Sequence, residues 1–127
     1  MKQVKNFLAR ASKLLFEASR EPKRSPDWNK VKNEHLSSSP TCAACGSFEN
    51  LHVHHKIPFH IQPELELDPD NLITLCMKPG MECHLNVGHG DSWRSYNPKV
   101  QKDAAVLLKN PRRRQEKLLE IKKNRKP

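Results

Sequence analysis

The chain has 127 residues, of which 35% are hydrophobic and 6% aromatic, and its formal net charge is +9. Such a composition allows one small domain with a modest core, and domains of this kind often depend on a metal ion or on disulfides. No apolar run is long enough to span a membrane, and charges interrupt the N-terminus where a secretory signal would be continuous and apolar. We therefore expect a cytoplasmic protein, and in that reducing compartment the four cysteines bind metal more readily than they pair.

The charge is distributed unevenly along the chain. Residues 1–38 carry nine Lys/Arg and four Asp/Glu, residues 39–98 carry three and seven, and residues 99–127 carry eleven and three. The resulting net charges are +5, −4 and +8, so basic segments flank an acidic one. This pattern suits binding to a polyanion such as DNA, although two solvated basic helices would give the same pattern.

Two helices are predicted in the N-terminal segment. Apolar residues recur at helical spacing over residues 1–19, and EPKRSP at 21–26 ends that pattern. Ser25 can cap a second helix, which would carry Trp28 on its inner face. The SSSP run at 37–40 ends this helix.

Two short strands and three further helical starts follow. Leu51–His55 and Leu72–Leu75 read as strands, joined by the proline-rich connection KIPFHIQPELELDPD. A helix is predicted to begin near Cys83 and to end at GHGD. Asn97-Pro98 and Asn110-Pro111 each resemble a helix cap followed by a first helical residue.

The four cysteines form two pairs along the sequence. Cys42 and Cys45 are separated by two residues, the spacing of a metal knuckle, and six residues separate Cys76 from Cys83. The loop between the second pair would have to bulge to bring its two sulfurs together. Two such pairs predict one tetrahedral structural zinc. Two disulfides, or a site in which a histidine replaces one sulfur, are the alternatives.

Four of the seven histidines lie in LHVHHKIPFH, residues 51–60. A closed four-cysteine site has no open position for chemistry, so catalysis would need a second metal or a metal-free base. His52 and His60 are expected to be surface or structural residues. Trp28 and Trp93 are expected in the core, because large aromatic side chains dominate small cores.

Three dipeptides in order, together with the cysteine pairs, resemble the HNH endonuclease family. They are His54-His55, Asn71-Leu72 at the start of an apolar strand, and Cys83-His84 at the start of a helix. The similarity covers residues 40–90 by motif and extends to the Trp-Arg-Ser-Tyr-Asn-Pro run at 93–98 and back to Trp28. The cysteine pairs resemble the zinc-stapled, four-cysteine branch of the family, and the flanking residues resemble bacterial and phage members. It implies an α+β fold, with a small ββα-metal core and a four-cysteine structural zinc, flanked by N- and C-terminal helices.

The resemblance divides the chain into three expected parts. Residues 1–38 form a basic helical N-terminal extension, residues 39–98 the zinc-stapled nuclease core, and residues 99–127 a basic helical C-terminal tail. The expected location is the cytoplasm of a bacterial or phage-infected host cell.

The resemblance also implies roles for individual residues. His54 occupies the first metal-ligand position, His55 the general-base position, and Asn71 the position that orients the loop and the base. His84 occupies the position of the second metal ligand, although it lies thirteen positions after Asn71 and the widened cysteine loop must account for this. His89, five residues further on, is the second choice for that ligand.

Adjacent side chains on a regular strand point to opposite faces of the sheet. His54 and His55 would therefore share a site only if the chain left regular β geometry at that point. Ile57-Pro58 supports a bend there, and Asn71 could hold the bend by bonding backbone groups across the long loop.

The implied function is metal-dependent endonucleolytic hydrolysis of DNA phosphodiester bonds, by nicking or by double-strand cleavage. The expected cofactors are structural Zn and one catalytic divalent metal, which is Mn, Mg, Ni, Co or Zn, since imidazoles suit transition metals and magnesium prefers oxygen ligands. The candidate contacts to DNA phosphates are Arg94, Arg112, Arg113 and Arg114. The alternative is a non-catalytic zinc-stapled nucleic-acid-binding module, or an accessory subunit with protein partners in a DNA-processing or packaging complex.

Overall fold

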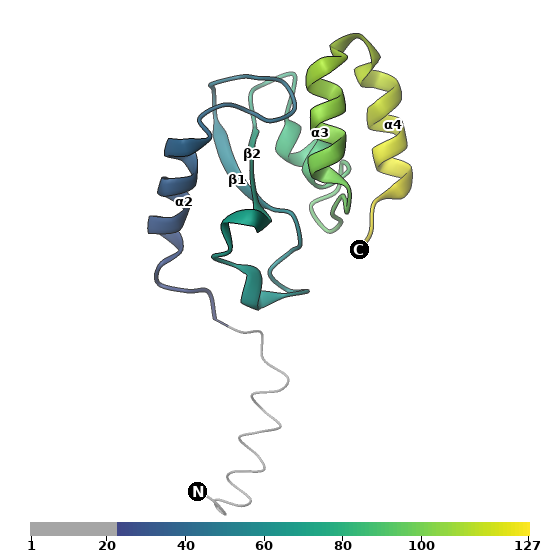
Figure 1. Cartoon of the computed structure of the whole chain (residues 1–127). Coiled ribbons are helices and arrows are strands. Elements are labelled where there is room, and N and C mark those ends of the chain that lie inside the picture. The colour runs from purple at the N-terminus through teal and green to yellow at the C-terminus, as the bar shows by residue number, and fades with distance from the viewer. Residues whose placement is uncertain (1–22) are drawn as a thin grey trace, which may run out of the picture.

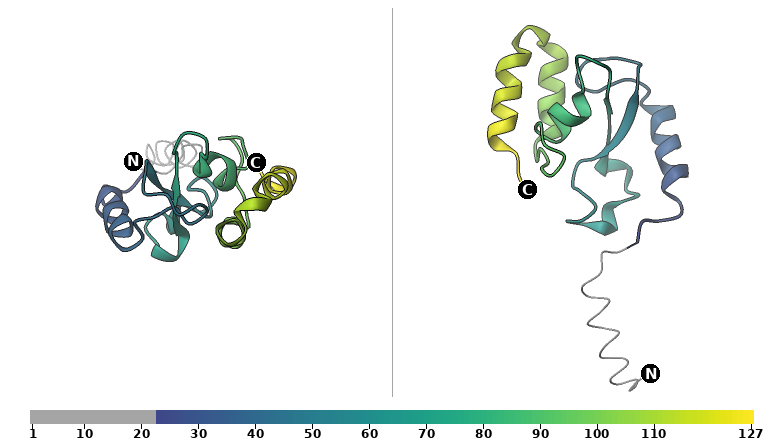
Figure 2. Two further views of the ribbon diagram at one scale, coloured as in Figure 1. Left: turned by 90° about the horizontal axis from the view of Figure 1, so that it is seen from above. Right: turned by 180° about the vertical axis from the view of Figure 1, so that it is seen from behind.

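The computed structural model describes residues 23–127, and the helix predicted over residues 1–19 lies outside this range. The described part is an α+β structure, in which one two-stranded antiparallel sheet lies between helix α2 on one side and helices α3 and α4 on the other (Figures 1 and 2). Within it, none of the helices combines the length and the apolar character that a membrane crossing requires.

The described elements follow one another in this order: α2 (Trp28–Ser38), β1 (Leu51–His55), η1 (Pro63–Leu65), η2 (Pro69–Asn71), β2 (Leu72–Cys76), η3 (His84–Gly88), α3 (Val100–Lys109), η4 (Pro111–Arg113) and α4 (Arg114–Asn124). The elements labelled η are short 3-10 helices, except η3, which is a π-helical turn. The two strands lie where the sequence predicts them. Helix α2 begins later than predicted, because Ser25 first closes a turn: its Oγ accepts from Asp27 N at 3.0 Å and its carbonyl accepts from Trp28 N at 3.2 Å.

Strand β1 pairs with β2 in one unbroken register, from Leu51 opposite Cys76 to His55 opposite Leu72. The prediction that the chain leaves β geometry at the paired histidines is therefore wrong. The bend follows at Lys56, whose N–H donates to the carbonyl of Asn71 at 2.8 Å. Strand β2 is buried along its whole length, whereas β1 has a free edge, and this edge becomes important for the site.

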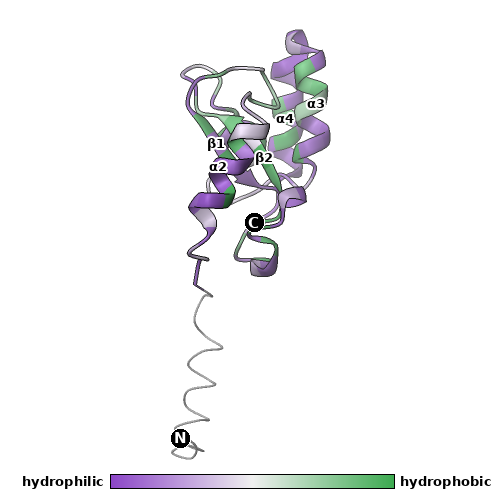
Figure 3. Cartoon of the chain, turned by 60° about the vertical axis from the view of Figure 1, so that its left-hand side comes forward, coloured by the Kyte–Doolittle hydropathy of each residue, from purple (hydrophilic) through white to green (hydrophobic). Residues whose placement is uncertain are grey.

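One hydrophobic core joins the sheet to the C-terminal helices. Its buried members are Cys42, Ala44, Ile73, Leu75, Cys76, Cys83, Val87, Val100, Ala104, Leu107 and Ile121. Helix α3, which carries both hydrophobic and hydrophilic residues (Figure 3), contributes Val100, Ala104 and Leu107 to this core at helical spacing and also buries Asp103. The C-terminal segment is thus part of the packing that surrounds the cysteines.

A buried polar network locks the helical hairpin of α3 and α4 to the rest of the core. The carboxylate of Asp103, only 6% exposed, accepts from Asn97 Nδ2 at 3.0 Å and pairs with Lys117 Nζ at 3.0 Å. The amide of Asn97 also donates to the carbonyl of Val87 in η3 at 3.0 Å. These bonds connect α3, α4 and η3 around one carboxylate.

Replacing Asp103 with alanine should lower the free energy of unfolding by about 3 kcal/mol, because the half-buried ammonium of Lys117 and the buried amide of Asn97 lose their common acceptor. Chemical denaturation of the metal-loaded protein measures this change. The matched control is Glu120→Ala, which removes the 57%-exposed partner of the same Lys117 and should cost less than about 1 kcal/mol. Equal losses in the two variants would show that the network does not support the fold.

Candidate active site

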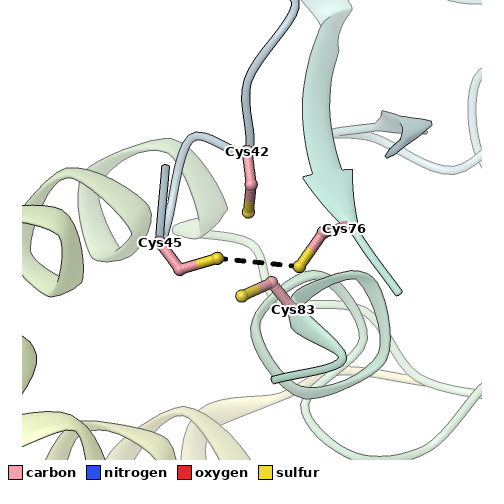
Figure 4. A group of neighbouring side chains, drawn as sticks. All are labelled: Cys42, Cys45, Cys76 and Cys83. Carbon is pink, nitrogen blue, oxygen red and sulfur yellow. Dashed lines mark hydrogen bonds between the residues drawn. The ribbon is translucent and has the colours of Figure 1, made fainter. Parts of the chain in front are cut away.

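Four cysteine side chains converge from three segments of the chain. Cys42 and Cys45 lie on one turn, Cys76 ends β2, and Cys83 directly precedes η3; their sulfurs point toward one another (Figure 4). All four sulfurs lie within 4.8 Å of one another, and those of Cys45 and Cys76 are 3.7 Å apart. A tetrahedral zinc site with Zn–S distances of about 2.3 Å has sulfur–sulfur edges of about 3.8 Å. The cluster therefore has the dimensions of a four-thiolate metal site.

The pKa values of the cysteine thiols also favour a bound cation. A hydrogen bond with the Cys83 sulfur lowers the pKa of Cys42 to about 4, and the same bond together with burial raises the pKa of Cys83. Burial also raises the pKa of Cys45 to about 11. The proximity of the sulfurs thus opposes the ionisation of neighbouring thiols, and a bound dication would stabilise all four as thiolates.

Arg114, one of the candidate phosphate contacts, lies at this cluster. Its guanidinium donates to the Cys83 sulfur at 3.4 Å and to the carbonyl of Met81 at 2.8 Å. A cation beside a four-thiolate site offsets part of its negative charge. Arg113 pairs with Glu116 at 2.8 Å and is nevertheless 73% exposed, and Arg94 and Arg112 are also exposed.

A second cluster consists of three histidines. His54 of β1, His84 at the start of η3 and His89 just beyond its end bring ring nitrogens within 4.8 Å of one another. The side chain of His54 is 3% exposed, and its Nε2 is buried without a hydrogen-bond partner among the described residues. An unpaired buried nitrogen is costly, and a metal ion at this point would remove that cost. The three residues therefore fit a divalent metal.

Hydrogen bonds set the ring orientations of two of these histidines. His89 Nδ1–H donates to the carbonyl of Ser95 at 2.7 Å, so the lone pair of this ring is on Nε2. His84 Nδ1 lies 3.0 Å from Nδ1 of His52, which leaves Nε2 of His84 for another partner. Bonds of this kind to the second ring nitrogen are the usual support of metal-binding histidines.

The π-helical turn η3 explains why both His84 and His89 reach the cluster. A π-helix closes i→i+5 hydrogen bonds, so residues five apart approach one another, as residues four apart do in an α-helix. Gly88 lies on the inner side of this turn, where a Cβ would be 3.1 Å from Cε1 of His54. The sequence predicts His84 as the second ligand with His89 as the alternative, and the structure brings both to the cluster.

Burial keeps the three imidazoles neutral. Desolvation lowers the pKa of His54 well below its usual value, and the charges of His84 and His89 add to this effect. Desolvation likewise lowers the pKa of His84 to about 3, and it lowers the pKa of His89. Neutral imidazoles are the form that binds metal.

His55, the candidate base, is held separately from the three-histidine cluster. Its Nε2–H donates to the carbonyl of Glu66 at 2.9 Å, so Nδ1 carries the lone pair. Burial lowers the pKa of His55, so the ring is neutral near pH 7. A neutral imidazole with a fixed tautomer can accept a proton from water.

Asn71 positions the loop that supplies this carbonyl. Its Oδ1 accepts from Ile57 N at 2.9 Å, and its Nδ2 donates to the carbonyls of Ile57 at 3.1 Å and Leu65 at 3.3 Å. Asn71 is buried, and it clamps both ends of the connection between the strands. Asn71 and His55 therefore bond to adjacent carbonyls of the same loop, those of Leu65 and Glu66.

The histidines line one groove of about 500 Å³, which runs along the free edge of β1 and is bounded on the other side by α2. A groove at the edge of a strand can be lined from both faces of that strand. His54 and His55 therefore both reach it although they point to opposite faces.

Both tryptophans lie outside the core, contrary to expectation. Trp28 is half-buried and its ring is 4.6 Å from that of His55 between centroids. Trp93 is 54% exposed, and its ring centroid lies 5.2 Å from His84 and 4.9 Å from His89. Trp28 and His55 are distant along the chain, so no local pattern predicts their contact, whereas Trp93 follows His89 by four residues and meets it through the local turn. His52 and His60 are exposed, as expected.

Comparison with protein-family models matches residues 42–90 to the family described as HNH endonuclease. Comparisons with curated proteins and with solved structures give no match. The matched segment contains both clusters and His55, whereas α2, α3 and α4 lie outside it.

Purified protein should contain about one tightly held zinc per chain at the cysteine cluster, the stoichiometry of a single tetrahedral site. Cys42→Ser should abolish this zinc and unfold the domain, because structural zinc contributes on the order of 10 kcal/mol, comparable to the whole stability of a small domain. The control His84→Ala should keep both the zinc and the fold. Elemental analysis and thermal melts test this, and an intact melt for Cys42→Ser would contradict it.

The second cluster should bind one divalent ion through His54, His84 and His89. His84→Ala and His89→Ala should each weaken Mn²⁺ or Ni²⁺ binding by roughly tenfold or more, since each removes one of three ligands. Calorimetric titration measures the affinity, with His60→Ala as the control for loss of an exposed imidazole. An unchanged metal affinity in His89→Ala would show that His89 is not a ligand and that His54 and His84 alone bind the ion.

Proposed function

We propose that this chain, whose residues 42–90 belong to the HNH endonuclease family, is a metal-dependent endonuclease that hydrolyses DNA phosphodiester bonds. The observation that carries the proposal is the pair of imidazole environments along one groove. Three histidines lie together, and Nε2 of one of them, His54, is buried without a hydrogen-bond partner among the described residues. A fourth histidine, His55, is held by a hydrogen bond in the neutral form that a general base requires.

The residues that would hold the catalytic metal are His54, His84 and His89. When bound, a divalent ion supplies charge stabilisation for the phosphate oxygens and for the leaving 3′ oxygen. An all-imidazole set favours Mn, Co, Ni or Zn, and Mg would depend on oxygen ligands from the substrate and water. Three protein ligands leave coordination positions open for the phosphate.

His55 is the proposed general base. Its Nδ1 accepts the proton of a water molecule that attacks phosphorus, and the ring becomes an imidazolium. The Nε2–H bond to the Glu66 carbonyl keeps the tautomer correct before the transfer and stabilises the positive ring after it. Asn71 is the proposed positioning residue for this pair, since it clamps the loop on which the carbonyl lies.

The four cysteines are the proposed ligands of a structural zinc that fixes the two halves of the catalytic site. Cys76 ends the strand that pairs with the strand carrying His54 and His55, and Cys83 immediately precedes His84. One ion on both cysteines would hold η3 against the sheet. Arg94, Arg112 and Arg113 are the exposed candidates for contacts to DNA phosphates.

Purified wild-type protein should nick or linearise plasmid DNA with at least one of Mn²⁺, Co²⁺, Ni²⁺, Zn²⁺ and Mg²⁺. Replacement of His55 by alanine should slow cleavage by roughly 10²–10⁴-fold, the usual contribution of a general base. Gel analysis of initial rates across the metal series measures the effect. His60→Ala is the control for loss of an exposed imidazole, because His60 lies in the connection that follows β1.

Equal cleavage by wild type and His55→Ala would remove His55 from the mechanism. DNA binding without cleavage under any of these metals would favour a non-catalytic binding module. Neither binding nor cleavage would favour an accessory role in a larger complex.

A further inference from the structure

Helix α2 lies outside the segment matched to the family, yet it forms a wall of the groove that contains the histidines. Its contributions are Trp28, Lys32 and Leu36, which are spaced four residues apart and therefore lie on one face of the helix. A face that served only for packing would be apolar throughout. Here a lysine lies in its middle, opposite the histidines of β1.

Trp28 lies directly against the candidate base. Its ring centroid is 4.6 Å from that of His55, and the two planes are inclined by 32°. His55 is thus held by the Glu66 carbonyl through Nε2 and by an indole ring against the imidazole. Both contacts restrict the rotation of the ring that has to present Nδ1 to a water molecule.

The residues just before α2 also secure Glu66. Ser25 N–H donates to Glu66 Oε1 at 2.9 Å, and Arg24 Nε lies 3.2 Å from Oε2 of the same carboxylate, whose side chain is 6% exposed. The Arg24 guanidinium also lies 4.2 Å from the centroid of the Phe59 ring, above its face. The N-terminal segment therefore supports the base in two ways, through Trp28 and through the anchoring of Glu66.

The charges of this segment indicate what occupies the groove. Residues 23–38 carry four Lys/Arg and two Asp/Glu, and Arg24 and Lys32 both line the groove. The floor is the three-histidine cluster, which would hold a dication, and the remaining lining from Leu36, Val53 and Phe59 is apolar. Cationic groups at the wall and floor, with apolar surface between them, complement a nucleic-acid strand, whose phosphates alternate with sugars and bases.

We propose that α2 contributes two residues to the nuclease site. Lys32 binds a phosphate of the DNA strand in the groove, and Trp28 is a positioning residue for His55. This rests on the proposed function, since it assigns a substrate path and a support to that same site. The family-matched segment alone would then lack one wall of its substrate groove.

The Lys32 contact is tested by DNA binding, which does not require cleavage. Lys32→Glu should weaken binding of the zinc-containing protein to a labelled duplex by roughly tenfold. It should also reduce the slope of the logarithm of the binding constant against the logarithm of salt concentration by about one, which corresponds to one phosphate contact. Lys30→Glu is the matched control, because it makes the same charge change on an exposed position of the same helix outside the groove. Fluorescence anisotropy without added catalytic metal measures both. Equal weakening by the two variants would overturn the assignment.

The Trp28 contact is tested by separating catalysis from binding. Trp28→Leu keeps apolar bulk but loses the ring, and it should lower kcat by roughly 10–100-fold, while KM, catalytic-metal affinity and the thermal melt stay within twofold or a few degrees of wild type. Trp28→Phe, which restores an aromatic face, should recover most of the rate. An unchanged kcat in Trp28→Leu, or a parallel loss of metal affinity and fold, would overturn the positioning role.

These outcomes are distinguishable from failure of the proposed function itself. If wild-type protein cuts no DNA with any metal, the nuclease proposal fails and the positioning role of Trp28 fails with it. The comparison of Lys32→Glu with Lys30→Glu still decides whether the groove binds the strand.

Discussion

The convergence of four cysteine sulfurs is the constraint on which the rest of this structure depends. It draws together a turn, the end of β2 and the start of η3, and three of its four side chains are fully buried within the hydrophobic core. Sulfurs this close cannot all be thiolates unless a cation lies among them. A metal at this point would therefore be part of the core, and it would place His84, the residue after Cys83, against the sheet.

The groove depends on a second constraint, the small size of the sheet. A two-stranded sheet leaves one edge of β1 unpaired, and this edge is where residues from both faces of the strand become accessible together. His54 can then remain buried against Gly88 and the other two histidines, while His55 turns to Glu66 and Trp28. Two adjacent imidazoles thus have different surroundings without any distortion of the strand, and different surroundings allow different chemical roles.

Elements beyond the family-matched segment complete both sites. Arg114 of α4 donates to the sulfur of Cys83, and the buried Asp103 network ties α3 and α4 to η3. On the opposite side, α2 forms the wall of the histidine groove and contacts the candidate base. The matched segment carries the chemically reactive groups, and the flanking helices stabilise them and shape the space in front of them.

The sequence by itself determined the two strands and the pairing of the cysteines into one cluster, and its resemblance to the HNH family indicated the α+β fold class and two of the three clustered histidines, His54 and His84. Spacing along the chain is sufficient for these, because two-residue knuckles, alternation in strands and ordered family motifs are local patterns. The tertiary structure decided three matters that depend on how the folded chain is packed. It placed both His84 and His89 at one point through a π-helical turn, kept His54 and His55 in regular pairing at a free edge, and moved Trp28 and Trp93 from the expected core to the histidines. No local pattern encodes these, since the energy of each contact depends on which side chains the packed chain brings opposite one another.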